Sequence, residues 1–436
     1  MIHILIPNNN TEERTYVSKV VFEEILGIEY EIKPDLSLNS TLLEWDNKTI
    51  IFKDDFWNKG GIGVQNLPQV KYSTNTFTVE PDIPILYGDE TIKIGENNIE
   101  CGVDIFASIF FMLTRWEEHV VENRDQYERF IGKESIAFKY GFLHRPIVNE
   151  YIEMIWKMMI YLGYGGERKQ RDFQIVLTHD IDHPFMKDRF VETSKSIIRS
   201  LLSLDFKSIP IYLTYYLKDP YNTYNFLMDI SERIGVKSHF YLMSSDEGIS
   251  ESKKSPYLTK QFKHVVSEIR KRNHVIGFHP GYFSILSENN WKNEKEELIS
   301  FLGFSPDEGR QHYLRFNMPE TFSFWEHSNM NLDSTLSYPD VEGFRCGTGD
   351  AFSVFNFLER KEYRLKERPL VIMDGTLMFY QGYSMEKTKD ILNYYIGLGR
   401  KYKMPITLLF HNSIFIGDKG ARLMKLYESC ISSIGH

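Results

Sequence analysis

The chain has 436 residues and a formal net charge of −9. This surplus of negative charge gives no attraction to phosphate backbones, so we expect no nucleic-acid partner. Three cysteines, Cys101, Cys346 and Cys430, stand far apart without a CxxC pair, which argues against a disulfide framework and a thiolate metal site. No apolar run approaches the roughly 18 residues of a membrane span, and the N-terminal apolar run is too short for a signal peptide. We therefore expect a cytoplasmic protein without a membrane span.

The first part of the chain predicts a small α/β domain. Residues 2–7 form an apolar run typical of a buried strand, and residues 12–26 follow a helical pattern. Strand-like segments follow at residues 30–36 and 49–55. The turn after the first strand lacks a glycine-rich phosphate fingerprint, so no nucleotide site is predicted there. Since this region offers no set of catalytic residues, we expect it to mediate homo-oligomer formation, substrate gating or contact with a partner.

A helical connector is predicted next. Residues 104–121 and 147–162 have the patterns of amphipathic or buried helices. The glycine-rich, basic segment at residues 163–171 is the best candidate for a linker. The chain is therefore predicted to contain an N-terminal α/β domain at residues 1–103, a connector at residues 104–170, and a larger domain at residues 171–436.

Predicted strands and helices alternate throughout the larger domain. Strand-like segments lie at residues 173–180, 237–243, 274–279, 312–316 and 404–411. Helical segments lie at residues 224–235, 259–272, 294–304 and 320–328. This alternation predicts a parallel sheet that closes, or nearly closes, into a distorted (β/α) barrel. Chemistry in such barrels lies at the carboxyl ends of the strands, which is where several polar residues of this region stand.

A pair of aspartates follows the first strand of this barrel. Asp180 and Asp182, in the segment THDIDHP, stand two residues apart and share a face of an extended chain. Two carboxylates this close need a nearby cation, or one of them must hold a proton. A divalent metal bound by one, with the other acting as a base, satisfies this requirement. A simple turn cluster before Pro184 is the alternative.

Three more strand ends carry residues suited to the same site. His279 ends a strand directly before Pro-Gly, where a neutral imidazole is a common metal ligand. Arg310, in RQHYLRF, is able to orient a carboxylate and hold its pKa down. His411 ends the last strand and suits general acid catalysis. Considered singly, each also fits a structural histidine or a surface arginine.

In chain order these motifs resemble those of the polysaccharide deacetylases, the family-four carbohydrate esterases with NodB-like homology. THDID at residues 178–182 resembles the family's Thr-Phe-Asp-Asp-Gly motif in a variant with alternating aspartates. GFH at residues 277–279 stands at the metal-binding histidine motif, RQHY at residues 310–313 at Arg-Pro-Pro-Tyr, and LLFH at residues 408–411 at Leu-x-Ile-His. The segments RQHYLRF, DSTLSYPDVEGFRCGT and LVIMDGTL further resemble a branch with an additional N-terminal α/β domain.

The resemblance implies one divalent metal ion, with zinc expected, held by Asp182 and His279. The family's second metal-binding histidine is replaced here by Phe283, which cannot ligate a metal. A hydrolytic zinc site usually has three protein ligands, so a third must come from elsewhere. His312 and His183 are the two candidates, and His312 is the better placed of them.

The resemblance also implies a division of catalytic roles. Asp180 takes a proton from water, and Arg310 orients Asp180. A backbone N–H near Tyr313 donates to the oxyanion, and His411 protonates the leaving amine.

The leading expectation is an enzyme that removes an N-acetyl group from an amino sugar or saccharide. Arg345 and Asp333, in DSTLSYPDVEGFRCGT, are expected to support the site or contact the substrate. Two alternatives stay open. One is a hydrolase of a non-sugar amide on the same fold. The other is a non-catalytic carbohydrate-binding or assembly protein that has lost its metal, which Phe283 favours.

Overall fold

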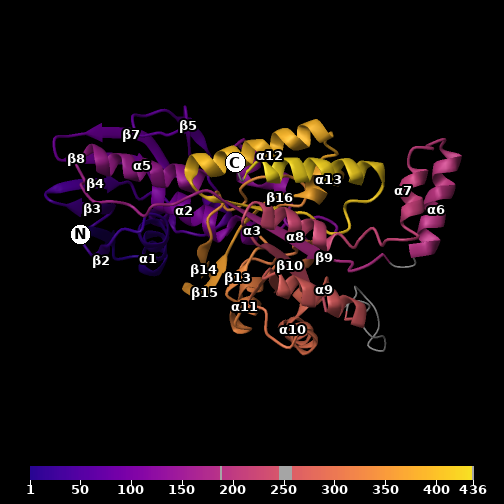
Figure 1. Cartoon of the computed structure of the whole chain (residues 1–436). Helices are drawn as coiled ribbons and strands as arrows, with labels where there is room; N and C mark the ends of the chain where they lie inside the picture. Colours follow the sequence, from indigo (N-terminus) through magenta and orange to yellow (C-terminus); the bar gives the residue numbers. More distant parts are fainter. Residues whose placement is uncertain (187–188, 245–257, 435–436) are drawn as a thin grey trace.

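The computed structural model describes residues 1–186, 189–244 and 258–434. Its strands form two large sheets, one from the N-terminal region and one from the region after residue 173. The two regions lie side by side, and the helical hairpin of α6 (Arg189–Leu202) and α7 (Ile209–Thr214) projects from the end of the molecule farthest from the N-terminal sheet (Figure 1).

The N-terminal sheet has six strands in the order β2-β1-β3-β4-β8-β7. Its strands are β1 (Ile2–Pro7), β2 (Tyr30–Asp35), β3 (Thr41–Trp45), β4 (Lys48–Phe52), β7 (Gly88–Ile94) and β8 (Asn98–Val103). β1 and β2 are parallel, as are β4 and β8, and the other pairs are antiparallel. A separate hairpin pairs β5 (Lys71–Ser73) with β6 (Ile83–Ile85). The predicted first helix is present as α1 (Thr11–Ser18), continued by a π-helical segment (Lys19–Ile25).

The predicted connector helices pack between the two sheets. Every residue of α2 (Ile105–Thr114) is buried, and the Asp104 carboxylate caps its start by accepting a hydrogen bond from the Ala107 N–H at 3.0 Å. Two short helices, α3 (Glu117–Val120) and α4 (Ile136–Lys139), follow, and then the longer α5 (Ile147–Tyr161). Phe355 of the second sheet contacts both Tyr16 of α1 and Phe110 of α2, with ring centroids 4.9 and 5.8 Å apart. The hydrophobic core therefore runs without a break from one sheet to the other.

The second sheet has nine strands in the order β14-β15-β13-β12-β11-β10-β9-β17-β16. They are β9 (Gln174–Ile181), β10 (Ser238–Leu242), β11 (Val275–Phe278), β12 (Glu308–Gly309), β13 (Leu332–Asp333), β14 (Phe352–Asn356), β15 (Lys361–Glu367), β16 (Leu370–Met373) and β17 (Pro405–Leu409). All neighbouring pairs are parallel except β14 with β15. The predicted parallel sheet is confirmed.

This sheet is curled into an open barrel. Tyr241 lies on β10 and Arg368 follows β15, four strands along, where a flat sheet would separate them by about 19 Å. Instead Arg368 Nη2 donates to Tyr241 Oη at 2.6 Å across the interior. The edge strands β14 and β16 do not pair with each other, so the barrel stays open. The α/β fold is thus a distorted barrel beside a smaller N-terminal α/β region.

Helices separate the strands from β9 to β13, as predicted, and they also separate β16 from β17, whereas β13, β14, β15 and β16, all within the described residues 258–434, follow one another without an intervening α-helix. They are α6 (Arg189–Leu202), α7 (Ile209–Thr214), α8 (Tyr224–Arg233), α9 (Lys260–Lys271), α10 (Glu288–Leu302), α11 (Glu320–His327), α12 (Met385–Tyr402) and α13 (Gly417–Ser432).

One predicted strand is wrong. Residues 312–316 do not form a strand, because Tyr313 and Leu314 adopt the left-handed backbone conformation with φ of 59° and 55°. The segment makes a single 3₁₀ turn (His312–Leu314) instead. The short β12 (Glu308–Gly309) takes the strand's place, so Arg310 still follows a strand. The turn directs this segment over the end of the barrel.

Candidate active site

The two aspartates lie at the carboxyl end of β9. Asp180 is buried and belongs to the strand, whereas Asp182 lies just beyond it with about a quarter of its side chain exposed. Both face His279, which follows β11. The distance from His279 Nε2 is 3.2 Å to Asp182 Oδ1 and 3.8 Å to Asp180 Oδ2. The parallel sheet therefore brings the two motifs together although almost 100 residues separate them.

His279 is held in an orientation that suits a metal ligand. Its Nδ1 lies 2.6 Å from the carbonyl oxygen of Arg310, which can only accept a hydrogen bond. In the neutral imidazole the proton therefore lies on Nδ1, and Nε2 carries a lone pair. Nε2 is buried, has no hydrogen-bond partner and faces the equally unpartnered Oδ1 of Asp182. Two acceptor atoms facing each other are the arrangement that a cation stabilises.

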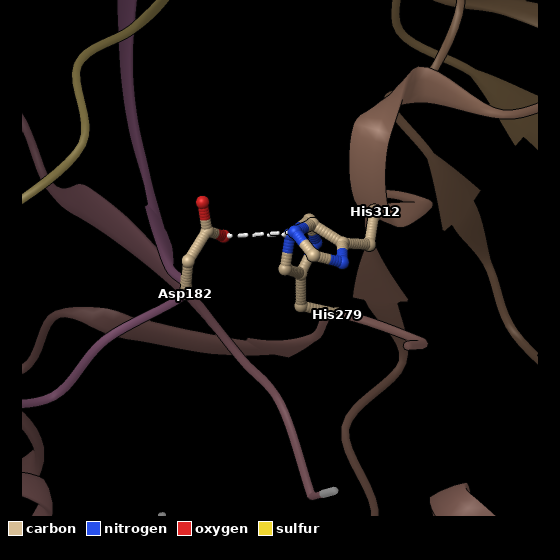
Figure 2. A group of neighbouring side chains, drawn as sticks. All are labelled: Asp182, His279 and His312. Atoms are coloured by element: carbon tan, nitrogen blue, oxygen red, sulfur yellow. Dashed lines mark ion pairs between the residues drawn. The ribbon is translucent and has the colours of Figure 1, made fainter. Parts of the chain in front are cut away.

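His312 completes the group. Its Nε2 lies 3.6 Å from Asp182 Oδ1, and its ring lies 5.0 Å from that of His279, centroid to centroid. Figure 2 shows the two imidazoles converging on the Asp182 carboxylate. One ligand atom from each of the three residues lies within 4.8 Å of the others. Two imidazoles and one carboxylate form the donor set of many hydrolytic zinc sites, so these residues fit a divalent metal.

The carboxyl group of Asp182 is ionised in this setting. Burial opposes its ionisation, but the positive charges that His312 and His411 carry when protonated outweigh that effect and hold the pKa of Asp182 well below its usual range. A permanently charged carboxylate is a competent metal ligand over the whole physiological pH range.

The side chain of Arg310 crosses the barrel interior to reach Asp180. It is fully buried, and its Nη1 donates to Asp180 Oδ1 at 2.8 Å and to Thr178 Oγ1 at 2.9 Å. Its Nε donates to the carbonyl oxygen of Ser334 at 2.7 Å, and Nη2 to the Ser334 hydroxyl at 3.1 Å. The guanidinium is therefore fixed at both ends, and it holds the Asp180 carboxylate in one orientation.

His411 lies on the other side of the Asp182 carboxylate, with its Nε2 at 3.6 Å from Asp182 Oδ2. Its Nδ1 lies 2.7 Å from Oδ1 of Asp374, and its backbone N–H donates to Oδ2 of the same carboxylate at 2.7 Å. Burial opposes protonation of His411, but the Asp374 and Asp182 carboxylates outweigh it and raise the pKa of His411 to about 10. A protonated histidine beside the aspartate pair is able to donate a proton to a leaving group.

Asp374 is a site residue that the sequence analysis did not select. It is fully buried, and it directly follows the apolar β16 (Leu370–Met373). The same signal that selected Asp180 and His411, a polar residue at the end of an apolar strand, was present in LVIMDGTL. The contact of Asp374 with His411 depends on the pairing of β16 with β17, which local sequence does not show.

These groups open into one cavity of about 590 Å³. Asp180, Asp182, His279, His312 and His411 line it, together with Tyr313. Apolar side chains form another part of its wall: Leu314, Met373, Met378, Leu409, Ile414 and Leu423. A cavity of this size accommodates a small organic ligand, with its polar reactive group against the aspartates and histidines.

Two predicted residues lie away from this cavity. Asp333 is fully buried beside Glu367, and burial raises its pKa to about 7. Arg345 is buried in an ion pair with Glu118 of α3. Neither lines the cavity, so neither is positioned to contact a substrate. The Arg345 guanidinium is neutralised by the Glu118 carboxylate, whereas Asp333 and Glu367 are two buried carboxyl groups whose pKa values are both raised by burial, so that a proton is favoured between them.

His183 and Phe283 do not belong to the three-residue group that fits a metal. His183, the other candidate for the third ligand, lines the cavity, but its ring stacks on Tyr221 at 6.2 Å and it is not part of the three-residue group. Phe283, at the family's second histidine position, is 46% exposed and does not line the cavity.

Residues 2–163 match the model of a family of unknown function, DUF7033. No curated protein shows a significant match to the chain. Among solved structures, the Puue allantoinase is 11% identical, with 63% of this chain and 90% of that chain covered and a TM-score of 0.40. The family 4 carbohydrate esterase from Streptomyces lividans is 8% identical, covering 61% and 91% with a TM-score of 0.31. The Bc1960 peptidoglycan N-acetylglucosamine deacetylase is 14% identical, covering 61% and 84%, also at 0.31.

Because these identities and TM-scores are low, the likenesses do not indicate the activity of this chain. Among the helices that the structure describes, none has the length and apolar character needed to cross a membrane.

Proposed function

We propose that this chain is a metal-dependent amide hydrolase that removes an N-acetyl group from an amino sugar or saccharide. The observation that carries the proposal is the arrangement around Asp182. Two imidazoles face its carboxylate from one side, and a second histidine–carboxylate pair faces it from the other. All of these groups open into the same cavity.

Asp182, His279 and His312 are the proposed metal ligands, and zinc fits their two nitrogens and one carboxylate oxygen best. Zinc bound by these residues would supply Lewis acidity, lowering the pKa of a water molecule and polarising the acyl carbonyl. Since His312 supplies a third ligand, the presence of Phe283 does not by itself argue for loss of the metal. This favours an enzyme over the non-catalytic alternative.

The other residues take separate roles in the proposed reaction. Asp180 accepts the proton of the attacking water, and the Arg310 guanidinium holds its carboxylate in one orientation through a hydrogen bond. A backbone N–H near Tyr313 donates to the oxyanion that forms on the acyl carbon. His411, kept protonated by Asp374, then gives its proton to the amine as the C–N bond breaks.

A second candidate is the hydrolysis of a non-sugar amide. The apolar wall of the cavity favours it, since Leu314, Leu409 and Met373 form a small hydrophobic cluster separate from the main core. For either substrate we propose residues 171–436 as the catalytic domain. Residues 1–103, and the connector at 104–170, would act as its support.

Matched Asp→Asn variants test the proposal. Asp180→Asn is expected to bind zinc as the wild type does but to lose about 10²–10⁴-fold in rate, because an amide cannot accept the proton. Asp182→Asn is expected to lose both zinc and activity, because it removes a charged ligand. Asp390→Asn, at an exposed position on α12, is the control and should match the wild type. Acetate release from N-acetylated amino sugars and zinc content are measured for each protein.

Two results would contradict the assignment. Full activity of Asp180→Asn would remove Asp180 as the base. A wild type that binds no zinc and releases no acid from sugar or non-sugar amides would refute the hydrolase and favour a binding protein. Activity on non-sugar amides alone would establish the second candidate.

A further inference from the structure

Helices α6 and α7 form a helical hairpin that projects from the barrel (Figure 1). It is inserted between β9, which carries Asp180, and α8. Its base is tied to the candidate site, since Asn412 Nδ2 donates to the carbonyl oxygens of His183 and Tyr221, both at 2.9 Å. The hairpin therefore rises from the same end of the barrel as the cavity.

The burial pattern of this hairpin is inverted relative to an ordinary helical pair. Its buried side chains are mostly small and polar, Thr193, Ser200 and Ser208, with Tyr215 at its far end. Many of its large apolar side chains are about half or more exposed: Phe190, Val191, Ile198, Leu201, Leu202, Leu204, Phe206, Leu213 and Leu217. Large exposed apolar patches are rare on monomeric soluble proteins and mark surfaces that bind an apolar partner.

Cationic side chains accompany the apolar ones. Residues 189–218 contain five cations against two carboxylates, a surplus of three positive charges in a chain whose net charge is −9. The cations are Arg189, Lys195, Arg199, Lys207 and Lys218. Apolar residues mixed with lysine and arginine, without the length for a membrane span, are typical of segments that bind the surface of a bilayer.

Charge decides between the possible occupants. A second copy docked through the same surface would place its surplus of positive charge against an identical surplus, which is unfavourable. An anionic lipid surface matches both features, because headgroups attract the cations and acyl chains cover the leucines and phenylalanines.

We propose that residues 189–218 dock on an anionic lipid surface. The turn between the helices inserts first, since Leu202 and Leu204 are 81% and 73% exposed there, with Lys207 and Arg199 beside them at headgroup level. Docking holds the catalytic cavity close to the bilayer, where its apolar wall accepts an amphiphilic ligand. The inference does not depend on the proposed hydrolysis, because it rests on the hairpin alone.

Co-sedimentation of the full chain with vesicles tests this inference. Vesicles of phosphatidylcholine alone are compared with vesicles containing phosphatidylglycerol. The wild type should sediment with the anionic vesicles, and added salt should weaken its binding. Leu202→Glu/Leu204→Glu should lose binding by about tenfold or more, and so should Arg199→Gln/Lys207→Gln. Leu36→Glu, at an 88% exposed position in the N-terminal region, is the matched control and should bind as the wild type does.

The outcomes separate the occupants. Failure of the wild type to sediment with either kind of vesicle would overturn the inference, as would undiminished binding by both double variants. The wild type could instead fail to bind vesicles but dimerise in sedimentation equilibrium, with Leu202→Glu/Leu204→Glu monomeric. That result would assign the surface to a second copy of the chain. Arg199→Gln/Lys207→Gln retains every apolar side chain of the hairpin, so the test remains valid if Leu202→Glu/Leu204→Glu misfolds. Hydrolytic activity is not the readout, so failure here leaves the proposed function standing.

Discussion

Replacing Arg310 by methionine should strongly destabilise the chain. Arg310 is fully buried and has four hydrogen bonds, one of them to the Asp180 carboxylate at 2.8 Å. Methionine cannot donate a hydrogen bond, so the buried Asp180 carboxyl group would lose its cationic partner. The serine and threonine partners of Arg310 would also lose their donor.

The size of the effect follows from these contacts. Removing one partner of a buried ion pair costs about 3–5 kcal/mol, because the other charge is left uncompensated. Most of that cost arises from the Asp180 carboxylate that is left without a cation, and less of it from the lost hydrogen bonds of Arg310. The double variant Arg310→Met/Asp180→Asn removes this charge, so it should recover roughly 1–3 kcal/mol of the loss.

Urea unfolding of the wild type, both single variants and the double variant measures these free energies. A chelator is present throughout, so that metal binding does not contribute. A loss below about 1 kcal/mol for Arg310→Met would refute the reasoning, since it would mean that the guanidinium does not compensate a buried charge. A double variant less stable than Arg310→Met alone would do the same.

Two further predictions concern the site. His312→Ala should lower zinc affinity by more than about 100-fold, whereas His183→Ala should leave the affinity unchanged. Competition with a chelating dye measures both affinities. Equal zinc affinities of the two variants would remove His312 from the metal site. Asp374→Asn should lower the pKa of His411 by about two units or more, because a neighbouring negative charge is lost. The raised pKa of about 10 keeps His411 protonated until the pH approaches that value, so the alkaline limb of kcat/KM should move toward neutral pH in Asp374→Asn. An unmoved limb in the pH–rate profile, with an unmoved His411 signal in an NMR titration, would exclude this coupling.

The sequence by itself predicted the alternation of strands and helices between β9 and α11, and several of the residues that line the cavity. Apolar segments of strand length alternate with amphipathic helical segments, and this pattern depends only on local periodicity. A parallel sheet brings the carboxyl ends of its strands to one edge, so Asp180, His279 and His411 could be assigned to one site without a structure. The preference for His312 as third ligand came from its place in the chain next to Arg310, and the three-residue group includes it.

Only the tertiary structure decided which side chains meet across the barrel. Arg310 reaches Asp180 and Arg368 reaches Tyr241 because the sheet curls, and the degree of curl has no signature in local periodicity. Asp374 lies beside His411 because β16 and β17 are neighbouring parallel strands, a pairing that local periodicity does not specify.

The remaining differences have the same origin. Asp333 and Arg345 carry charges that look available in the sequence, but in the folded chain Arg345 is paired with Glu118, and Asp333 is buried beside Glu367, where burial raises its pKa to about 7. The predicted strand at residues 312–316 failed because two left-handed residues turn the chain over the barrel end. An apolar pattern also cannot reveal whether its face is covered, and only the folded chain shows that the α6–α7 hairpin leaves its leucines exposed. The physical reason is general, since local sequence sets the shape of each segment, whereas burial and charge pairing depend on distances between segments that the fold alone determines.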